Sequence, residues 1–221
     1  MSSSGLGDDV IESVVNAVCL QLISCSQACK QAIAGIFAKI ADGAIVHDLL
    51  AMSEDTLEPD YDKRLAALSM LRRDFALIKM LQWRPILAIL LSNLEDCEEI
   101  AQRDQSAQLI YRFMREYAGS YETSMALIYP MIRKQVTHKQ DAVRCEFMSL
   151  LGKMVECYAD VDPSLNVLSP LLSRNQEESN FFLNINHLQV HRRARAIRLL
   201  PEFLQDSIVN IGEEHLRVLI D

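Results

Sequence analysis

The stretch Ala126–Glu156, ALIYPMIRKQVTHKQDAVRCEFMSLLGKMVE, decides the fold of this chain. An apolar segment containing Pro130 leads into a short polar turn. Asp141 then opens a second segment, whose apolar residues recur with the 3.6-residue period of a helix. An aspartate at this position can accept hydrogen bonds from the first backbone N–H groups of a helix. The stretch therefore predicts two helices joined by a tight turn, with Asp141 capping the second.

Segments of the same kind recur along the chain. The second helices of the predicted pairs are Gln27–Phe37, Asp62–Phe75, Asp104–Met114, Asp141–Val155 and Leu188–Leu200. Apolar partner segments precede them, such as Met125–Ile132 and Leu165–Leu172. The aspartates at positions 62, 104 and 141 are 42 and 37 residues apart, which matches the ~37–47 residues of HEAT and armadillo arrays.

The predicted fold is all-α: a HEAT/armadillo-like superhelical solenoid of antiparallel helix pairs, with roughly ten or eleven helices. Residues 1–8 are expected to be a disordered or artificial leader, and residues 9–221 an array of about five repeats. A repeat of this kind buries its apolar face only against a neighbour. Because the last residues, Leu216–Ile220, are largely apolar, we expect a fragment of a longer solenoid or a chain that needs a partner there.

Arginines near the starts of the second helices are expected to be structural. Arg144 should pack its aliphatic stem near Phe147 and Leu151 while its guanidinium reaches an acid in an adjacent repeat. We expect the same kind of role for Arg64 and Arg193.

Composition excludes several classes of protein. Seven glycines and six prolines in 221 residues disfavour turn-rich β architecture. No apolar run reaches the roughly 18–20 residues that cross a bilayer, so no membrane association is expected. The six cysteines form no C-x-x-C pair, which disfavours zinc and redox motifs. We expect them to be packed core thiols, which implies a reducing compartment. A net charge of −8 disfavours binding of nucleic acid over the whole surface and leaves only local basic patches for it.

Catalytic and metal-binding motifs are absent from the sequence. It holds no phosphate-cradling G-x-x-x-x-G-K-[ST], no G-x-S-x-G and no H-E-x-x-H. His187 and His191 have the i, i+4 spacing of a helical metal pair, but Arg192, Arg195 and Arg198 crowd them with positive charge that opposes a divalent ion. We expect no enzyme activity, no cofactor, no metal and no small-molecule substrate.

The candidate functional residues lie in Arg174–Leu200, RNQEESNFFLNINHLQVHRRARAIRLL. Helical periodicity places His187, His191, Arg195 and Arg198 on one basic stripe, beside Arg192. It places an apolar face on the opposite side, made of Val190, Ala194, Ile197, Leu200 and Leu204. The stripe is either a solvated face paired to acids such as Glu177, Glu178 and Glu202, or a contact for phosphate or for an acidic partner.

The paired aromatics Phe181 and Phe182 precede this helix, in a connection of residues 173–187 that is longer than the others. One interpretation is that they fill the gap between helices. The alternative is that they anchor a partner, since aromatic side chains dominate interface hot spots.

The pattern N-x-x-H-x-Q-x-H-R-R-A-R-A over Asn184–Ala196 resembles a segment of the small-subunit processome component 20 family, also called down-regulated in metastasis. The resemblance covers about 25 residues directly. It implies a large HEAT-repeat scaffold of ribosome biogenesis, located in the nucleus and nucleolus. Implied partners are processome proteins and the small nucleolar ribonucleoprotein, with pre-rRNA or small nucleolar RNA at the basic stripe. Alternatives are a HEAT-repeat nuclear transport receptor or other protein-binding adaptor, with exposed apolar slots between helices, and a helical enzyme with a closed pocket.

Overall fold

The computed structural model describes residues 29–30, 32, 44–53, 58–95, 98–173 and 175–207. Within these ranges every regular element is a helix, and β pairing is confined to one isolated antiparallel bridge between Met52 and Pro59. The predicted all-α class is confirmed. The leader over residues 1–8 and most of the helix predicted at Gln27–Phe37 lie outside the described residues. Nowhere in the described part is a helix both long enough and apolar enough to cross a membrane.

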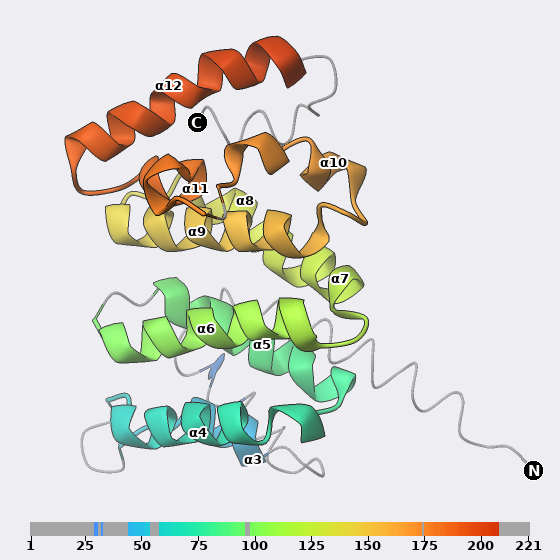
Figure 1. Cartoon of the computed structure of the whole chain (residues 1–221). Coiled ribbons are helices and arrows are strands. Elements are labelled where there is room, and N and C mark those ends of the chain that lie inside the picture. Colours follow the sequence, from blue (N-terminus) through green and yellow to red (C-terminus); the bar gives the residue numbers. More distant parts are fainter. Residues whose placement is uncertain are drawn as a thin grey trace, which may run out of the picture. The chain divides into compact units, whose positions relative to one another are not determined.

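The chain divides into two compact units, Met1–Ile110 and Tyr111–Asp221. The described elements of the first unit are α3 (Ala44–Leu49), α4 (Tyr61–Arg73), the 3-10 turn η1 (Phe75–Leu77), α5 (Met80–Glu95) and the first part of α6 (Ile100–Glu116). Figure 1 shows these elements in blue to green.

The core of the first unit is built on α5. The residues from Ile86 to Leu91 are fully buried, which is the pattern of a helix enclosed on all sides. Trp83 on the same helix packs against Phe75 with ring centroids 4.9 Å apart. Asn93 Nδ2 donates to Ser106 Oγ at 3.0 Å, which joins α5 to α6. Burial of the α5 run is therefore what holds this unit together.

The second unit continues from α6 into α7 (Ser120–Thr123), the π-helix η2 (Ser124–Ile128) and α8 (Tyr129–Gln135). These are followed by α9 (Asp141–Tyr158), α10 (Pro163–Asn166) and the 3-10 turns η3 (Ser169–Leu171) and η4 (Glu177–Ser179). The last described helices are α11 (Phe181–Asn184) and α12 (Val190–Ser207). The helix predicted at Leu165–Leu172 is wrong as a single element, because α10 and η3 divide this segment.

A buried polar network joins α7 to the end of α9. The hydroxyl of Tyr158 lies 2.9 Å from both Ser120 Oγ and Ser124 Oγ. Beyond α9, Asp162 accepts hydrogen bonds from Ser164 and from the hydroxyl of Tyr121, the latter at 2.9 Å. These contacts fix the start of α10 and hold it to α7.

The aspartates used to align the repeats do not begin their helices in the predicted way. Asp60 is the residue that caps α4, by accepting from Lys63 N at 3.0 Å. Asp104 lies inside α6, four residues after its start. Asp141 is the first residue of α9, but the cap position is Gln140 and no side chain caps the helix there. The prediction that Asp141 caps the helix is wrong, because its carboxylate pairs with Arg144 instead.

A better marker of the recurring helices is an arginine at the fourth position. α4, α6, α9 and α12 each carry one, at Arg64, Arg103, Arg144 and Arg193. Arg64 is buried, and its Nε donates to the carbonyl of Ala51 at 2.9 Å, in the segment before the helix. Arg144 also turns back to its own loop rather than reaching an acid in another repeat, which corrects that expectation.

Candidate functional site

The α11 helix places the two phenylalanines in the interior of the second unit. Asn180 caps α11 by accepting from Leu183 N at 3.4 Å, and the helix lies between α9 and α12 in contact with both (Figure 1). Phe181 and Phe182 are 0% and 1% exposed and pack edge to face, with centroids 5.6 Å apart. Both rings are enclosed by the chain itself, as the gap-filling interpretation expects. The partner-anchor interpretation is corrected, because neither ring reaches solvent.

The turn after α11 is held by arginine and histidine contacts. Arg193 Nη1 donates to the carbonyl of His187 at 2.7 Å and to that of Leu188 at 3.0 Å. The backbone N–H of Gln189 donates to His187 Nδ1 at 3.1 Å. These local bonds satisfy carbonyls at the start of α12 and fix the direction in which it leaves the turn.

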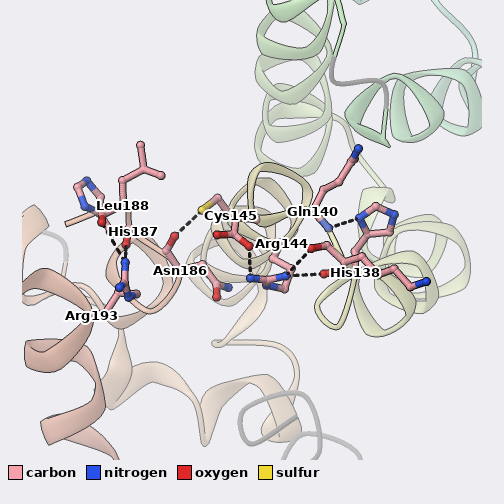
Figure 2. A network of polar contacts seen from close by, with 10 residues as sticks. His138, Gln140, Arg144, Cys145, Asn186, His187, Leu188 and Arg193 are labelled. Carbon is pink, nitrogen blue, oxygen red and sulfur yellow. Dashed lines mark hydrogen bonds and ion pairs between the residues drawn. The ribbon is translucent and has the colours of Figure 1, made fainter. Parts of the chain in front are cut away.

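The same set of contacts occurs 49 residues earlier. Arg144 Nη1 donates to the carbonyls of His138 and Lys139, at 2.6 and 3.2 Å, and Gln140 N donates to His138 Nδ1 at 3.2 Å. Both arginines and both histidines are drawn in Figure 2. The helices that follow, α9 and α12, start at Asp141 and Val190 and have 18 residues each. The second unit therefore repeats one helix–turn–helix motif, with the turn signature His-x-Gln-x-x-x-Arg.

A further hydrogen bond joins the turn before α12 to α9. Cys145 Sγ on α9 donates to the carbonyl of Asn186 at 2.8 Å, as Figure 2 shows. Burial raises the pKa of this thiol, with the neighbouring carboxylates of Glu146 and Asp141 adding to the effect, so it stays protonated as a donor.

His187 belongs to this turn and not to the helix, which corrects its predicted place on the stripe. Both of its ring nitrogens face a donor, with Gln189 N 3.1 Å from Nδ1, and a neutral imidazole can accept at one of them at a time. Arg192 Nη1, which can only donate, lies 2.9 Å from Nε2. Desolvation, together with the charges of Arg192, His191 and Arg193, lowers the pKa of His187 below its ordinary 6.5.

The other basic residues of the stripe do lie on α12, and all but Arg192 face solvent. His191, Arg195 and Arg198 are exposed, whereas Arg192 is half-buried. Arg195 forms an ion pair with Glu178, which lowers the pKa of that carboxyl through the hydrogen bond and the charge of the guanidinium. Arg198 makes no hydrogen bond or ion pair within the described part of the chain. One of the predicted acid pairings is thus present, and the side chains of His191 and Arg198 face solvent.

The apolar face predicted for this helix is wrong in its orientation. Val190 and Ile197 are 69% and 55% exposed, and the buried residues are Ala196 and Phe203. The buried side of α12 meets α11, η3 and η4. Consequently Val190 and Ile197 of the predicted apolar face lie on the solvent face beside the basic stripe, whereas Ala194, Leu200 and Leu204 are half-buried.

The sequence interpretation missed Asn184, which has a structural role here. Its Nδ2 donates to the carbonyls of Glu177 and Asn180, both at 2.6 Å, and the residue is buried. A buried amide that satisfies two carbonyls fixes η4 against α11. The sequence feature that could have pointed to Asn184 is the Asn-x-x-His step, of which it is the first residue. Among the described residues, no group of three or more His, Cys, Asp or Glu side chains could hold a metal ion.

Comparison with known proteins adds the identity of the family. Residues 25–140 match the model of the N-terminal region of U3 small nucleolar RNA-associated protein 20, and this match covers more than half of the chain. The protein of that name from Schizosaccharomyces pombe is 32% identical over 191 residues, and the one from Saccharomyces cerevisiae is 29% identical over 191 residues. Each alignment covers 80% of this chain and 8% of the relative, so the chain spans a small part of their length. This chain belongs to the family of U3 small nucleolar RNA-associated protein 20.

Proposed function

We propose that this chain is a non-catalytic scaffold segment that acts in small ribosomal subunit biogenesis, within the small-subunit processome that carries out pre-rRNA processing. Its relatives are named for association with U3 small nucleolar RNA, and no catalytic family is indicated for them. The proposed site of action is the nucleolus. The proposed architecture is a HEAT-like superhelical array. The recurrence of one helix–turn–helix motif in the second unit, and of an arginine at the fourth position of four helices, supports this array.

One observation carries the proposed contact: basic side chains of α12 that the fold does not use internally. Arg193 is committed to the turn and Arg192 is half-buried beside His187. Among the described residues His191 and Arg198 have no hydrogen-bonded or ion-paired partner, and the ion pair of Arg195 with Glu178 is exposed on both sides. An exposed pair of this kind contributes little to stability and can exchange for another anion. We propose that His191, Arg195 and Arg198 bind a component of the assembly.

The test is capture from nuclear extract by the full chain. The variant Arg195→Glu with Arg198→Glu reverses the charge of the stripe. A matched control, Lys134→Glu with Lys139→Glu, reverses two exposed cations elsewhere in the same unit. Both variants should keep the wild-type circular dichroism spectrum. We expect wild type and control to recover processome proteins and pre-rRNA, and the stripe variant to lose them.

Two outcomes would contradict the proposal. Equal capture by wild type and by the folded stripe variant would show that the stripe is a solvated face. Recovery of transport factors and their cargo, without ribosomal precursors, would favour a HEAT-repeat nuclear transport receptor instead. A fluorescent fusion that fails to reach the nucleolus would contradict the location.

A further inference from the structure

The solvent face of α12 carries an ordered row of apolar residues, which we name the ridge. Its members follow one another at alternating steps of four and three residues: Val190, Ala194, Ile197, Pro201 and Leu204. Val190 and Ile197 are more than half exposed, although burial of such side chains is favourable. Residues spaced in this way form the contact seam between two packed helices. The ridge therefore has the form of a helix-packing surface.

The internal repeat of the second unit allows the ridge of α12 to be compared with the equivalent row of residues on α9. Counted 49 residues earlier, the counterparts of the ridge on α9 are Asp141, Cys145, Met148, Gly152 and Val155. Met148 and Val155 are 3% and 0% exposed. Gly152 lies so close to Phe182 that an added Cβ would be 2.8 Å from the phenylalanine Cβ. On α9, then, Gly152 packs against a helix, α11, and Met148 and Val155 on the same row are buried.

The ridge of α12 differs from its counterpart at one informative position. Gly152 admits the side chain of Phe182, whereas Pro201 stands at the equivalent place and fills that space with its own ring. A helix covering α12 therefore cannot bring a phenyl group as close as α11 does to α9. It should present a small side chain opposite Pro201, and larger apolar ones opposite Ile197 and Leu204.

Charge further defines the occupant. His191, Arg195 and Arg198 each directly follow a ridge residue and so line one flank of the ridge on the solvent face. Opposite charges at such flanking positions select the partner of a helix pair. A basic flank disfavours a basic helix, and an apolar row offers nothing to the phosphates of an RNA. The ridge spans 15 residues, or about 21 Å between its first and last Cα, so it fits a partner of about four turns.

We propose that the ridge of α12 docks an acidic amphipathic helix of another protein, with apolar residues in heptad spacing and carboxylates facing His191, Arg195 and Arg198. This inference rests on the proposed function, since it specifies the class of partner that the stripe binds: an acidic protein helix and not RNA.

The test measures fluorescence anisotropy of labelled probes against the full chain. The first probe is a synthetic 18-residue helix with leucine in heptad spacing, except for an alanine at the heptad position meant to face Pro201, with glutamate on the flank and alanine elsewhere. The second probe has lysine in place of each glutamate, and the third is an 18-nucleotide single-stranded RNA. We expect the acidic helix to bind at least about tenfold more tightly than the lysine helix, and RNA to bind more weakly than the acidic helix.

The variant Ile197→Asp places a charge on the ridge without removing a buried group, because Ile197 is exposed. It should weaken binding of the acidic helix about tenfold or more, as expected when burial of one large apolar side chain is lost. Ile197→Leu keeps a large apolar side chain at this position and should retain the wild-type affinity. The matched control is Leu77→Asp, which alters a 79% exposed apolar residue of the first unit and should leave the affinity unchanged.

Several results would overturn the inference. The acidic helix could fail to bind, or its affinity could fall equally in Ile197→Asp and Leu77→Asp. RNA could also bind in a way that Arg198→Glu abolishes and Ile197→Asp leaves intact. A photo-cross-linker at position 197 that links to a second copy, or to residues 208–221 of the same chain, would also overturn it. If the Ile197→Asp variant still captures processome components fully, the inference is refuted and the proposed function is not. Binding of the acidic helix by a chain that captures no such component refutes the proposed function.

Discussion

The contact between Gly152 and Phe182 predicts the outcome of a substitution that would stabilise most helices. Gly152 lies in the interior of α9, where replacing glycine by alanine normally stabilises the helix by about 1 kcal/mol. Here the new Cβ would lie 2.8, 3.0 and 3.1 Å from Cβ, Cγ and Cδ2 of Phe182. Phe182 is buried and its Cβ moves only with the backbone of α11, so relief requires the whole short helix to shift. Overpacking of this kind costs about 1–3 kcal/mol.

We therefore expect Gly152→Ala to destabilise the chain by about 1 kcal/mol net, with a range of about 0–2 kcal/mol. For a protein of this size that is a fall of roughly 2–4 °C in Tm. Urea unfolding followed by circular dichroism measures the change in free energy of unfolding. The matched control is Ser149→Ala on the same helix, at a half-buried position, which should be neutral or slightly stabilising. If Gly152→Ala stabilises by the full ~1 kcal/mol of helix propensity, the packing of α11 on α9 is refuted.

Three further predictions concern the turns. Arg193→Met keeps the aliphatic stem but removes the donors to the carbonyls of His187 and Leu188, and should lower the free energy of unfolding by about 1–3 kcal/mol; an unchanged urea midpoint would show that the turn does not depend on these bonds. The pKa of His187 is lower in the folded chain than in the unfolded chain, so the unfolded chain binds the proton more readily. The contribution of His187 to stability should therefore fall as pH drops below about 6.5 toward the folded pKa. An NMR titration in which the ring titrates at or above pH 6.5 would contradict this. Burial of Asp162 raises the pKa of its carboxyl, but hydrogen bonds from Ser164 and Tyr121 outweigh burial and lower this pKa. The stabilisation by the Asp162 carboxylate should therefore be present above the unfolded pKa near 3.8 and be lost as pH falls through the folded pKa. Asp162→Asn should flatten this acid limb of the stability curve in urea titrations, and an unaltered limb would rule the carboxylate out as its source.

Helix content and most second-helix starts could be predicted because they depend on local periodicity. α9 starts at the predicted residue, and α12 starts two residues after the predicted Leu188. Helix caps were less accessible, since an aspartate near a helix start can cap the helix or pair with a neighbouring arginine. At Asp141 the second possibility holds. The choice depends on side-chain geometry that residue spacing does not contain.

The sequence correctly predicted a helix over the basic residues from His191 to Arg198, but not which face of that helix is buried. Periodicity identifies an apolar side of a helix. When a helix has apolar residues on two sides, periodicity does not say which of the two sides is buried. On α12 the buried side includes Ala196 and Phe203, whereas Val190 and Ile197 face solvent. Only the neighbours of the helix decide between the two sides. The residues Phe181 and Phe182 show the same limit, since adjacent aromatics suit a core and an interface equally well.

The paired turns also bear on how the chain folds. Each arginine bonds to carbonyls only five or six residues away, at His138 and Lys139 in one turn and at His187 and Leu188 in the other. Closing such short loops costs little chain entropy, so each turn can form before distant helices meet. Two equivalent starting points for structure therefore exist within one unit, and damage to one need not prevent the other from forming. In an array built from such hairpins, folding can begin at more than one place and spread to the neighbours.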